Sequence, residues 1–197
     1  VCRITFSGEL AFEINVPSWY GLATWQLIAD SGADLGITPY GTEAMHVLRA
    51  EKAYPISGHD TDGTVTPQDL GMDWIVSKKK KDFVGKRSFE RASYTENVRK
   101  QWVSVHAVDG STFLKEGTQL IDAKTPVTPS EGRVPMIGWV TSSYQSQALD
   151  RPFALALVTS GHDRIGERIS AVVDGAAVEC EIGETVVYDK EGARRDG

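Results

Sequence analysis

Two glutamates near the start of the chain, Glu9 and Glu13, stand where a carboxylate is unexpected. They belong to segment 6–17, which we expect to be a strand because Phe12, Ile14 and Val16 alternate with polar residues, the two-residue period of a half-buried strand. A carboxylate in such a setting needs a partner, and that partner can be a ligand. In an extended strand the two Cα atoms lie about 13 Å apart. The carboxyl pair of a glycosidase spans only about 5–9.5 Å, so we expect Glu9 and Glu13 to act separately.

The second group of reactive side chains lies in loop 55–67, which is long for a connection and therefore a candidate for function. His59 can shuttle a proton near neutral pH, but a lone histidine in a loop is more often a solvated side chain. Asp60 is more often a turn-forming residue than a ligand. Ser7 has no histidine or aspartate at a spacing that suggests a nucleophilic triad. We therefore assign no catalytic residue.

The cysteines and histidines show no metal-binding pattern. The chain has two cysteines, Cys2 and Cys180, and four histidines, without CxxC or HExxH spacing. We expect no metal site and no disulfide framework. This cysteine usage favours a reducing, cytoplasmic setting.

Composition excludes several classes of partner. The chain has 197 residues and a net charge of −6, with an ordinary apolar content of 41% that allows a sizeable core. An acidic chain is a poor binder of nucleic acid or of an anionic membrane surface, because both need a basic surface. The basic run Lys78–Lys81 is short and is interpreted as a solvated turn. No apolar run approaches the roughly 18 residues of a membrane span.

The first half of the chain predicts helices and few strands. After the strand at 6–17 we expect a helix over 19–30 that Ser18 caps and Gly32 ends. Apolar residues at helical spacing predict a second helix over 42–51. A short helix at 66–69 then leads into a strand at 71–76, in which Trp74 should be a core residue. A loop and a short amphipathic helix complete this half, over 82–91.

The second half is a series of short strands separated by glycine-containing turns, typical of a small barrel or sandwich. The expected strands are 101–108, 117–121, 136–142, 153–158, 168–173 and 176–182. Near residues 93–100 the pattern changes from predicted helices to short predicted strands. This change predicts an α+β domain over 1–95 and a small antiparallel β domain over 96–190. The charged residues 191–197 should form a flexible tail.

Three long segments together resemble one family. They are FSGELAFEINVP, ITPYGTEAMHVLRAEKAYPISGHDTDGTVTPQDLGMDWIVSKKKKDFVGKRSF and GWVTSSYQSQALDRPFALALV. In this order they are similar to the folate-dependent aminomethyltransferases, the family of the glycine cleavage T-protein. Within the family the sequence of these segments most resembles the C-terminal part of the α subunit of heterotetrameric sarcosine oxidase. The resemblance extends over about residues 3–188.

The resemblance implies a fold, a cofactor and a site. It implies an α+β fold in which a partial pocket-forming subdomain is followed by a small antiparallel β-barrel. The implied cofactor is tetrahydrofolate, and the implied product is 5,10-methylenetetrahydrofolate made from the methyl carbon of sarcosine. Glu13 matches the glutamate that meets the polar edge of the pterin, while Tyr144 and Arg151 match a barrel loop that faces the folate. Flavin, NAD and the other sarcosine oxidase subunits would bind elsewhere in the parent protein.

Two departures from the family bear on activity. The family's catalytic aspartate lies upstream of the segments matched here, so we expect the chain alone to be inactive. Met45 stands where glycine cleavage T-proteins have a folate-binding arginine, which favours the sarcosine oxidase type. Arg49, by contrast, is expected to pair with a nearby carboxylate in a structural role, and Glu9 to brace the turn at Gly8.

Three alternatives to this function stay open. One is an ordinary glycine cleavage aminomethyltransferase that takes its substrate from a lipoyl arm. Another is a non-catalytic folate-binding relative of the iron–sulfur-assembly or tRNA-modifying type, whose members often carry a cysteine motif that Cys2 and Cys180 do not match. The last is a subunit-interaction module that binds no folate.

Overall fold

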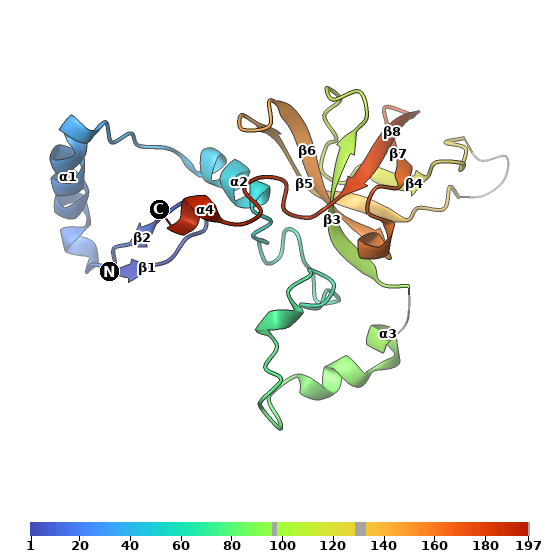
Figure 1. Cartoon of the computed structure of the whole chain (residues 1–197), viewed down its shortest axis with the longest axis horizontal. Coiled ribbons are helices and arrows are strands. Elements are labelled where there is room, and N and C mark those ends of the chain that lie inside the picture. The colour runs from blue at the N-terminus through green and yellow to red at the C-terminus, as the bar shows by residue number, and fades with distance from the viewer. Residues whose placement is uncertain (96–97, 129–132, 197) are drawn as a thin grey trace.

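A closed six-stranded barrel forms the second half of the molecule. The structure is a computed structural model and describes residues 1–95, 98–128 and 133–196. Neighbouring strands are all antiparallel, in the closed order β3-β6-β5-β4-β7-β8 (Figure 1). The strands are β3 (Lys100–Ala107), β4 (Gln119–Asp122), β5 (Gly138–Ser146), β6 (Arg151–Thr159), β7 (Arg168–Val173) and β8 (Ala176–Gly183). The expected α+β class with a small antiparallel barrel is confirmed, and each of the six predicted strands is present.

The barrel has a packed interior and a second apolar cluster on its outer face. Inside, all six strands contribute buried apolar residues, mostly β-branched or small, among them Val103, Val105, Ala154 and Ile182. Outside, Trp102 of β3 and Phe153, Leu155 and Leu157 of β6 pack with Ala50 from the helical half. Strand β6 is therefore buried on both faces, which explains why its sequence is continuously apolar instead of alternating.

Strands β5 and β6 approach closely at one point. An added Cβ at Gly138 would lie 2.1 Å from the carbonyl oxygen of Leu157, so only glycine fits there. Between Val140 and Ser142 the pairing of β5 with β6 shifts by one residue, as at a β-bulge.

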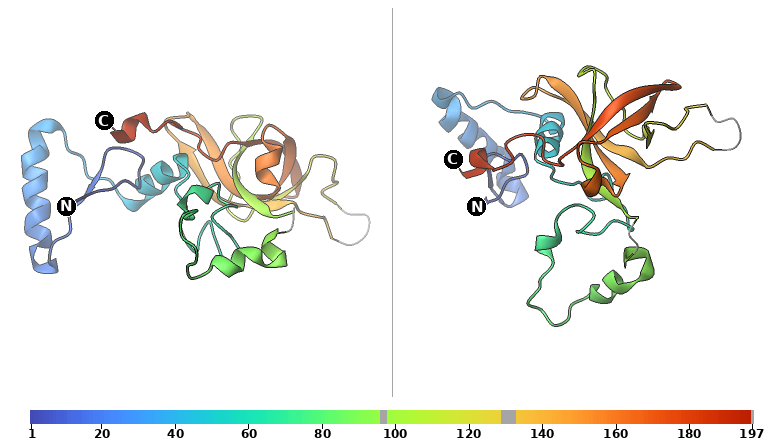
Figure 2. Two further views of the ribbon diagram at one scale, coloured as in Figure 1. Left: turned by 60° about the horizontal axis from the view of Figure 1, so that its bottom comes forward. Right: turned by 45° about the vertical axis from the view of Figure 1, so that its right-hand side comes forward.

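The first half of the chain holds helices and a very small hairpin. The hairpin consists of β1 (Cys2–Arg3) and β2 (Phe12–Glu13). The α-helices are α1 (Gly21–Gly32), α2 (Thr42–Glu51) and α3 (Ala92–Thr95), and α4 (Ala193–Asp196) follows the barrel. Short 3-10 helices occupy Ser18–Tyr20, Ala33–Leu35, Asp73–Ile75, Lys86–Glu90 and Gly161–Arg164. Helix α2 lies between the hairpin and the barrel, and α1 lies beyond the hairpin (Figures 1 and 2).

Several local predictions for this half are wrong. Segment 6–17 is not one strand: only its residues Phe12 and Glu13 pair, because among the residues that the structure describes their strand partner is the equally short β1. Ser18 makes no capping hydrogen bond, since residues 18–20 already form a 3-10 turn. The α-helix does end at Gly32, as predicted, but Gly32 is right-handed, and the left-handed glycine is Gly36, with φ 74°, after a 3-10 turn.

The predicted strand at 71–76 is also wrong. A 3-10 helix replaces it, and the Trp74 side chain, expected in the core, is 74% exposed. It lies on an arm of chain, residues 73–95, that extends away from the barrel (Figure 1). Lys78–Lys81 lie exposed in a bend on this arm, as the prediction of a solvated turn requires.

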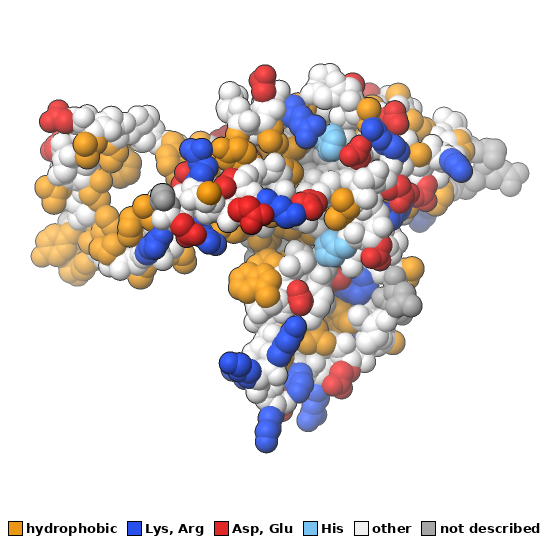
Figure 3. Space-filling view, in the orientation of Figure 1, with side chains coloured by type: hydrophobic (Ala, Val, Ile, Leu, Met, Phe, Trp, Pro, Cys, Tyr) orange, Lys and Arg blue, Asp and Glu red, His pale blue; other side chains and the backbone are white. Residues whose placement is uncertain are grey.

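Apolar side chains gather on the outer surface of α1 and the hairpin. Trp19, Leu22 and Trp25 are 77%, 69% and 60% exposed. Figure 3 shows this surface at the end of the molecule opposite the barrel. Nothing in the described part of the chain covers it.

The end of the chain differs from the expected flexible tail. Residues 193–196 form α4, which contacts the β1–β2 hairpin through a hydrogen bond from the Leu10 amide to the Arg194 carbonyl of 3.0 Å. The positions of the domain boundaries, at 95 and 190, remain predictions.

Candidate functional site

A buried ion pair joins the helical half to the barrel. Arg49, on the last turn of α2, is fully buried and donates to the carboxylate of Asp60, which is 1% exposed. The pairing of Arg49 with a nearby carboxylate is thus confirmed. Asp60 was expected to form a turn, and it does accept the Ile56 amide at 2.9 Å, but its main partner is the guanidinium. Each of these buried charges compensates the other, because an unpaired charge at this depth would destabilise the fold.

Strand β5 completes this network with hydroxyl groups. Arg49 donates to Ser142 Oγ at 2.9 Å and to the Tyr144 hydroxyl at 3.1 Å. Ser142 and Thr141 each donate to the other carboxylate oxygen of Asp60, Thr141 at 3.0 Å. The Asp60 carboxylate therefore has a donor at each oxygen. Arg49 Nε has no partner among the described residues, so the guanidinium is not fully satisfied.

The same helix end makes a second polar contact with the barrel. Glu51, 4% exposed, accepts a hydrogen bond of 2.6 Å from Ser146 Oγ. The predicted apolar face of 42–51 is only half-buried, and the fully buried turn is Arg49–Glu51. Alternate hydroxyl residues along β5, in the sequence TSSYQS, are the sequence signal for this polar strip on the outer barrel face.

Of the three predicted folate-binding residues, two lie on the barrel and one on the hairpin. Tyr144 is half-buried, touches Arg49 and packs against Phe153, with ring centroids 6.4 Å apart. Arg151 is half-buried at the start of β6, beside a small cavity of about 160 Å³. Glu13 is exposed on β2 and, within the described residues, has neither an ion pair nor a hydrogen bond to its side chain. No hydrogen bond in that part of the chain joins it to Tyr144 or Arg151.

A larger cavity lies at the end of α2. Its volume is about 420 Å³, and its lining is mainly apolar. Tyr54 and the exposed Trp74 supply aromatic walls, and Lys52 and His162 supply polar groups. The ring of Phe6, in the loop between β1 and β2, stacks on Tyr54 at 6.2 Å. The hairpin that carries Glu13 therefore lies beside this cavity. The cavity was not predicted from the sequence, because Trp74 was expected in the core.

The remaining candidates have no catalytic setting. His59 contacts Glu116 at 3.1 Å on the surface. Burial raises the pKa of the Cys180 thiol to about 11, so this cysteine is not a nucleophile at neutral pH. Among the residues that the structure describes, no three histidine, cysteine or acidic side chains gather as metal ligands. Nor does any described helix have the length and hydrophobicity of a membrane-spanning segment.

Comparison with known proteins identifies the family. The description "GCVT N-terminal domain" matches residues 1–80, and "Glycine cleavage T-protein C-terminal barrel domain" matches residues 100–189. The chain belongs to the glycine cleavage T-protein family. Segments that match the two descriptions follow one another in order, which agrees with the helical half and the barrel seen in the structure.

Members of this family differ in how closely they resemble the chain. Sarcosine oxidase subunit alpha from Corynebacterium sp. (strain U-96) is 55% identical over 197 residues, which are the whole of this chain and 20% of that subunit. An aminomethyltransferase from Desulfitobacterium hafniense (strain DSM 10664 / DCB-2) is 28% identical, over 98% of this chain and 49% of its own. The chain thus spans about a fifth of the first relative and half of the second.

A solved T-protein has the same fold. The crystal structure of glycine cleavage system aminomethyltransferase T from Bartonella henselae matches with a TM-score of 0.80 at 22% identity. The match covers 95% of this chain and 49% of that protein. It establishes the shared fold of the family.

Proposed function

We propose that this chain forms part of a tetrahydrofolate site in a sarcosine oxidase α subunit. The observation that carries the proposal is the 55% identity with a sarcosine oxidase α subunit over the full length of the chain, inside a family of aminomethyltransferases. The parent protein would oxidise sarcosine with flavin and NAD bound outside this chain, together with further subunits in the cytoplasm. The one-carbon unit released would then be captured on the folate.

Glu13 has the properties of a ligand for the pterin ring. Its carboxylate is exposed, and in the described part of the chain no cation neutralises it. Its neighbours Phe12 and Ile14 are 58% and 46% exposed, which offers apolar surface beside the charge. A pterin presents adjacent N–H and NH₂ donors, and a carboxylate can accept both at once, as it does from a guanidinium. The residues present therefore fit the cofactor.

The other two residues have supporting roles in this proposal. Arg151 has no ion pair among the described residues, and in this proposal it would meet an anionic group such as the carboxylate end of a folate. The Tyr144 ring would contact the folate tail while its hydroxyl stays bonded to Arg49. The cavity beside Tyr54 supplies apolar surface next to the hairpin.

When bound, tetrahydrofolate would supply the nitrogen that accepts the one-carbon unit, giving 5,10-methylenetetrahydrofolate. The part played by this chain is to bind and orient. Glu13 would fix the ring, which holds the reacting atoms in place and removes the entropic cost of their encounter. The chain itself contributes no assigned proton donor or nucleophile.

Calorimetric titration with tetrahydrofolate tests the assignment of Glu13. In Glu13→Gln we expect the dissociation constant to rise roughly 10- to 100-fold, because a hydrogen bond to a charged group contributes about 1.5–3 kcal/mol. Glu179→Gln is the matched control, since Glu179 is also an exposed strand glutamate, on β8. Equal affinity of Glu13→Gln and the unchanged protein would remove Glu13 from the site.

A glycine cleavage aminomethyltransferase is the second candidate function. The shared fold and the 28% identity to an aminomethyltransferase favour it, while Met45 and the much higher identity to sarcosine oxidase weigh against it. Activity with a lipoylated carrier protein would reverse this order.

A further inference from the structure

The hairpin that carries Glu13 is too small to hold its own position. Strands β1 and β2 are two residues long and pair only through Cys2 with Glu13 and Arg3 with Phe12. All four residues are exposed. An isolated two-stranded hairpin is at best marginally stable in water, even when it is longer. The position of Glu13 must therefore depend on contacts with other parts of the chain.

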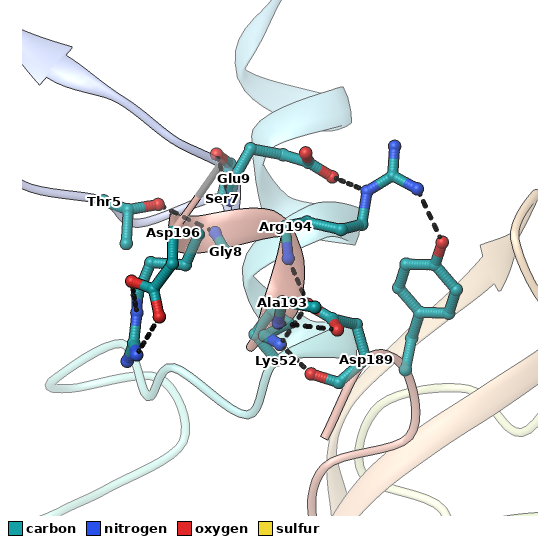
Figure 4. A network of polar contacts seen from close by, with 11 residues as sticks. Thr5, Ser7, Gly8, Glu9, Lys52, Asp189, Ala193, Arg194 and Asp196 are labelled. Carbon is teal, nitrogen blue, oxygen red and sulfur yellow. Dashed lines mark hydrogen bonds and ion pairs between the residues drawn. The ribbon is translucent and has the colours of Figure 1, made fainter. Parts of the chain in front are cut away.

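The C-terminal segment 187–196 provides an anchor. We call it the C-terminal strap. Its base is fixed to the end of α2, where the amides of Val187 and Tyr188 donate to the Glu51 carbonyl at 3.1 and 3.2 Å. Lys52 forms a largely buried ion pair of 3.0 Å with Asp189. The Asp189 carboxylate also accepts the Ala193 amide at 3.0 Å, so the start of α4 is tied to the same point (Figure 4).

Arg194 connects this strap to the hairpin loop. Its carbonyl accepts the Leu10 amide at 3.0 Å, and its Nε donates to Glu9 at 2.7 Å. A second nitrogen of its guanidinium donates to the Tyr188 hydroxyl at 3.0 Å, which orients the side chain (Figure 4). Glu9 was expected to brace the Gly8 turn, and the structure shows that its partner is Arg194.

Gly8 and Arg3 complete the attachment. Gly8 has φ 82° and lies so close to Lys52 that an added Cβ would be 2.2 Å from its Cγ. Arg3 of β1 donates to the carbonyl of Arg195 at 3.2 Å. The strap and the end of α2 thus hold the hairpin at its loop and at one strand.

We propose that Arg194 is a positioning residue for Glu13, its side chain acting through Glu9 beside the Leu10 hydrogen bond that its carbonyl accepts. This inference rests on the proposed function, because it gives the hairpin its purpose. Arg194 lies beyond residues 1–80 and 100–189, the parts matched by the family descriptions, so the family comparison assigns it no role. The strap ties the cofactor-binding hairpin to the barrel end of the molecule.

Two readouts on the complete protein test this role. In Arg194→Ala we expect amide hydrogen exchange at Leu10 to Glu13 to quicken three- to fivefold, and tetrahydrofolate affinity to fall by a similar factor. The midpoint of thermal unfolding should stay within a degree or two, because the Glu9 pair is exposed. Arg195→Ala is the matched control: its side chain pairs with the adjacent Asp196, and its carbonyl bond to Arg3 survives the change.

Exchange of the two charges adds a rescue experiment. The double variant Glu9→Arg with Arg194→Glu should recover at least half of the lost affinity and protection, whereas either single reversal should not. Failure of this rescue, or equal exchange rates in Arg194→Ala and Arg195→Ala, would overturn the positioning role.

The two proposals fail in different ways. If Glu13→Gln weakens tetrahydrofolate binding but Arg194→Ala does not, the folate site stands and the role of Arg194 is overturned. If Arg194→Ala quickens exchange while Glu13→Gln binds tetrahydrofolate normally, the anchoring of the hairpin is supported and the folate assignment to Glu13 is contradicted.

Discussion

At the scale of single residues, the buried Arg49–Asp60 ion pair is the feature that should tolerate substitution least. Both side chains are fully buried, and the partners of Asp60 come from its own loop, from α2 and from β5. Removing one member of a buried pair leaves an uncompensated charge, which costs more than the pair itself contributes.

Asp60→Asn should therefore destabilise the protein strongly. We expect the free energy of unfolding, measured by urea denaturation, to fall by about 3–5 kcal/mol, because Arg49 keeps its buried charge without a counterion. Asp122→Asn is the control: it removes one of the two carboxylate partners of Arg164, in a surface ion pair in which the Asp122 side chain is 56% exposed. That change should cost less than about 1 kcal/mol. A similar small loss for Asp60→Asn would contradict the structural role assigned to the pair.

At the scale of elements, a clip between Asp69 and Arg99 attaches the arm to the barrel. Arg99 Nε donates to Asp69 Oδ1 at 2.8 Å, and a second nitrogen donates to the other carboxylate oxygen. Thr66 adds its amide and its hydroxyl, both at 2.8 Å, in the reciprocal pattern of a capping box. The Asp69 carbonyl accepts the Trp102 amide of β3 at 2.7 Å. The clip sets where the chain enters the barrel.

Stability should depend on the ionisation of this clip. Burial alone raises the pKa of Asp69, but the hydrogen bonds from Arg99 and Thr66 outweigh it and hold the pKa below 3.8. A carboxylate with a lowered pKa in the folded state stabilises the fold above its unfolded value, and this contribution is lost as the pH falls through the folded value. Asp69→Asn should therefore lower the free energy of unfolding at pH 6. The difference in this free energy between the variant and the unchanged protein should become smaller below pH 3.8.

Urea denaturation of both proteins at several pH values measures this difference. If the difference in the free energy of unfolding stays constant from pH 6 to below the folded pKa, the charge of Asp69 contributes nothing to stability.

The elements also show what sequence patterns can and cannot predict. The strands of the barrel were predicted correctly because each one pairs with other strands of this chain. Alternating apolar residues and turn glycines therefore predict where these strands begin and end. Trp74 was misplaced because its apolar character was taken as a sign of burial, and the structure puts it on the wall of a surface cavity. Segment 6–17 has a strand pattern, but a strand needs partners, and only the two residues of β1 supply them.

At the scale of the whole molecule, the half that carries Glu13 is the more open one. The barrel is closed and its core is buried, whereas α1 and the hairpin expose their apolar side chains (Figure 3). The candidate site was predicted only in part. The resemblance pointed to Glu13, but nothing in the sequence pattern indicated that Arg194, far along the chain, lies beside the same hairpin. Contacts of this kind depend on tertiary packing, which local periodicity does not encode.

The most direct test of the central claim follows the methyl carbon of sarcosine. The complete protein is supplied with sarcosine labelled with ¹³C in its methyl group, and with tetrahydrofolate, and the products are measured by ¹³C NMR. The unchanged protein should deliver the label mainly to 5,10-methylenetetrahydrofolate, while Glu13→Gln should release most of it as formaldehyde at an unchanged rate of sarcosine oxidation. The same partition of label in both proteins would contradict a folate site built on Glu13.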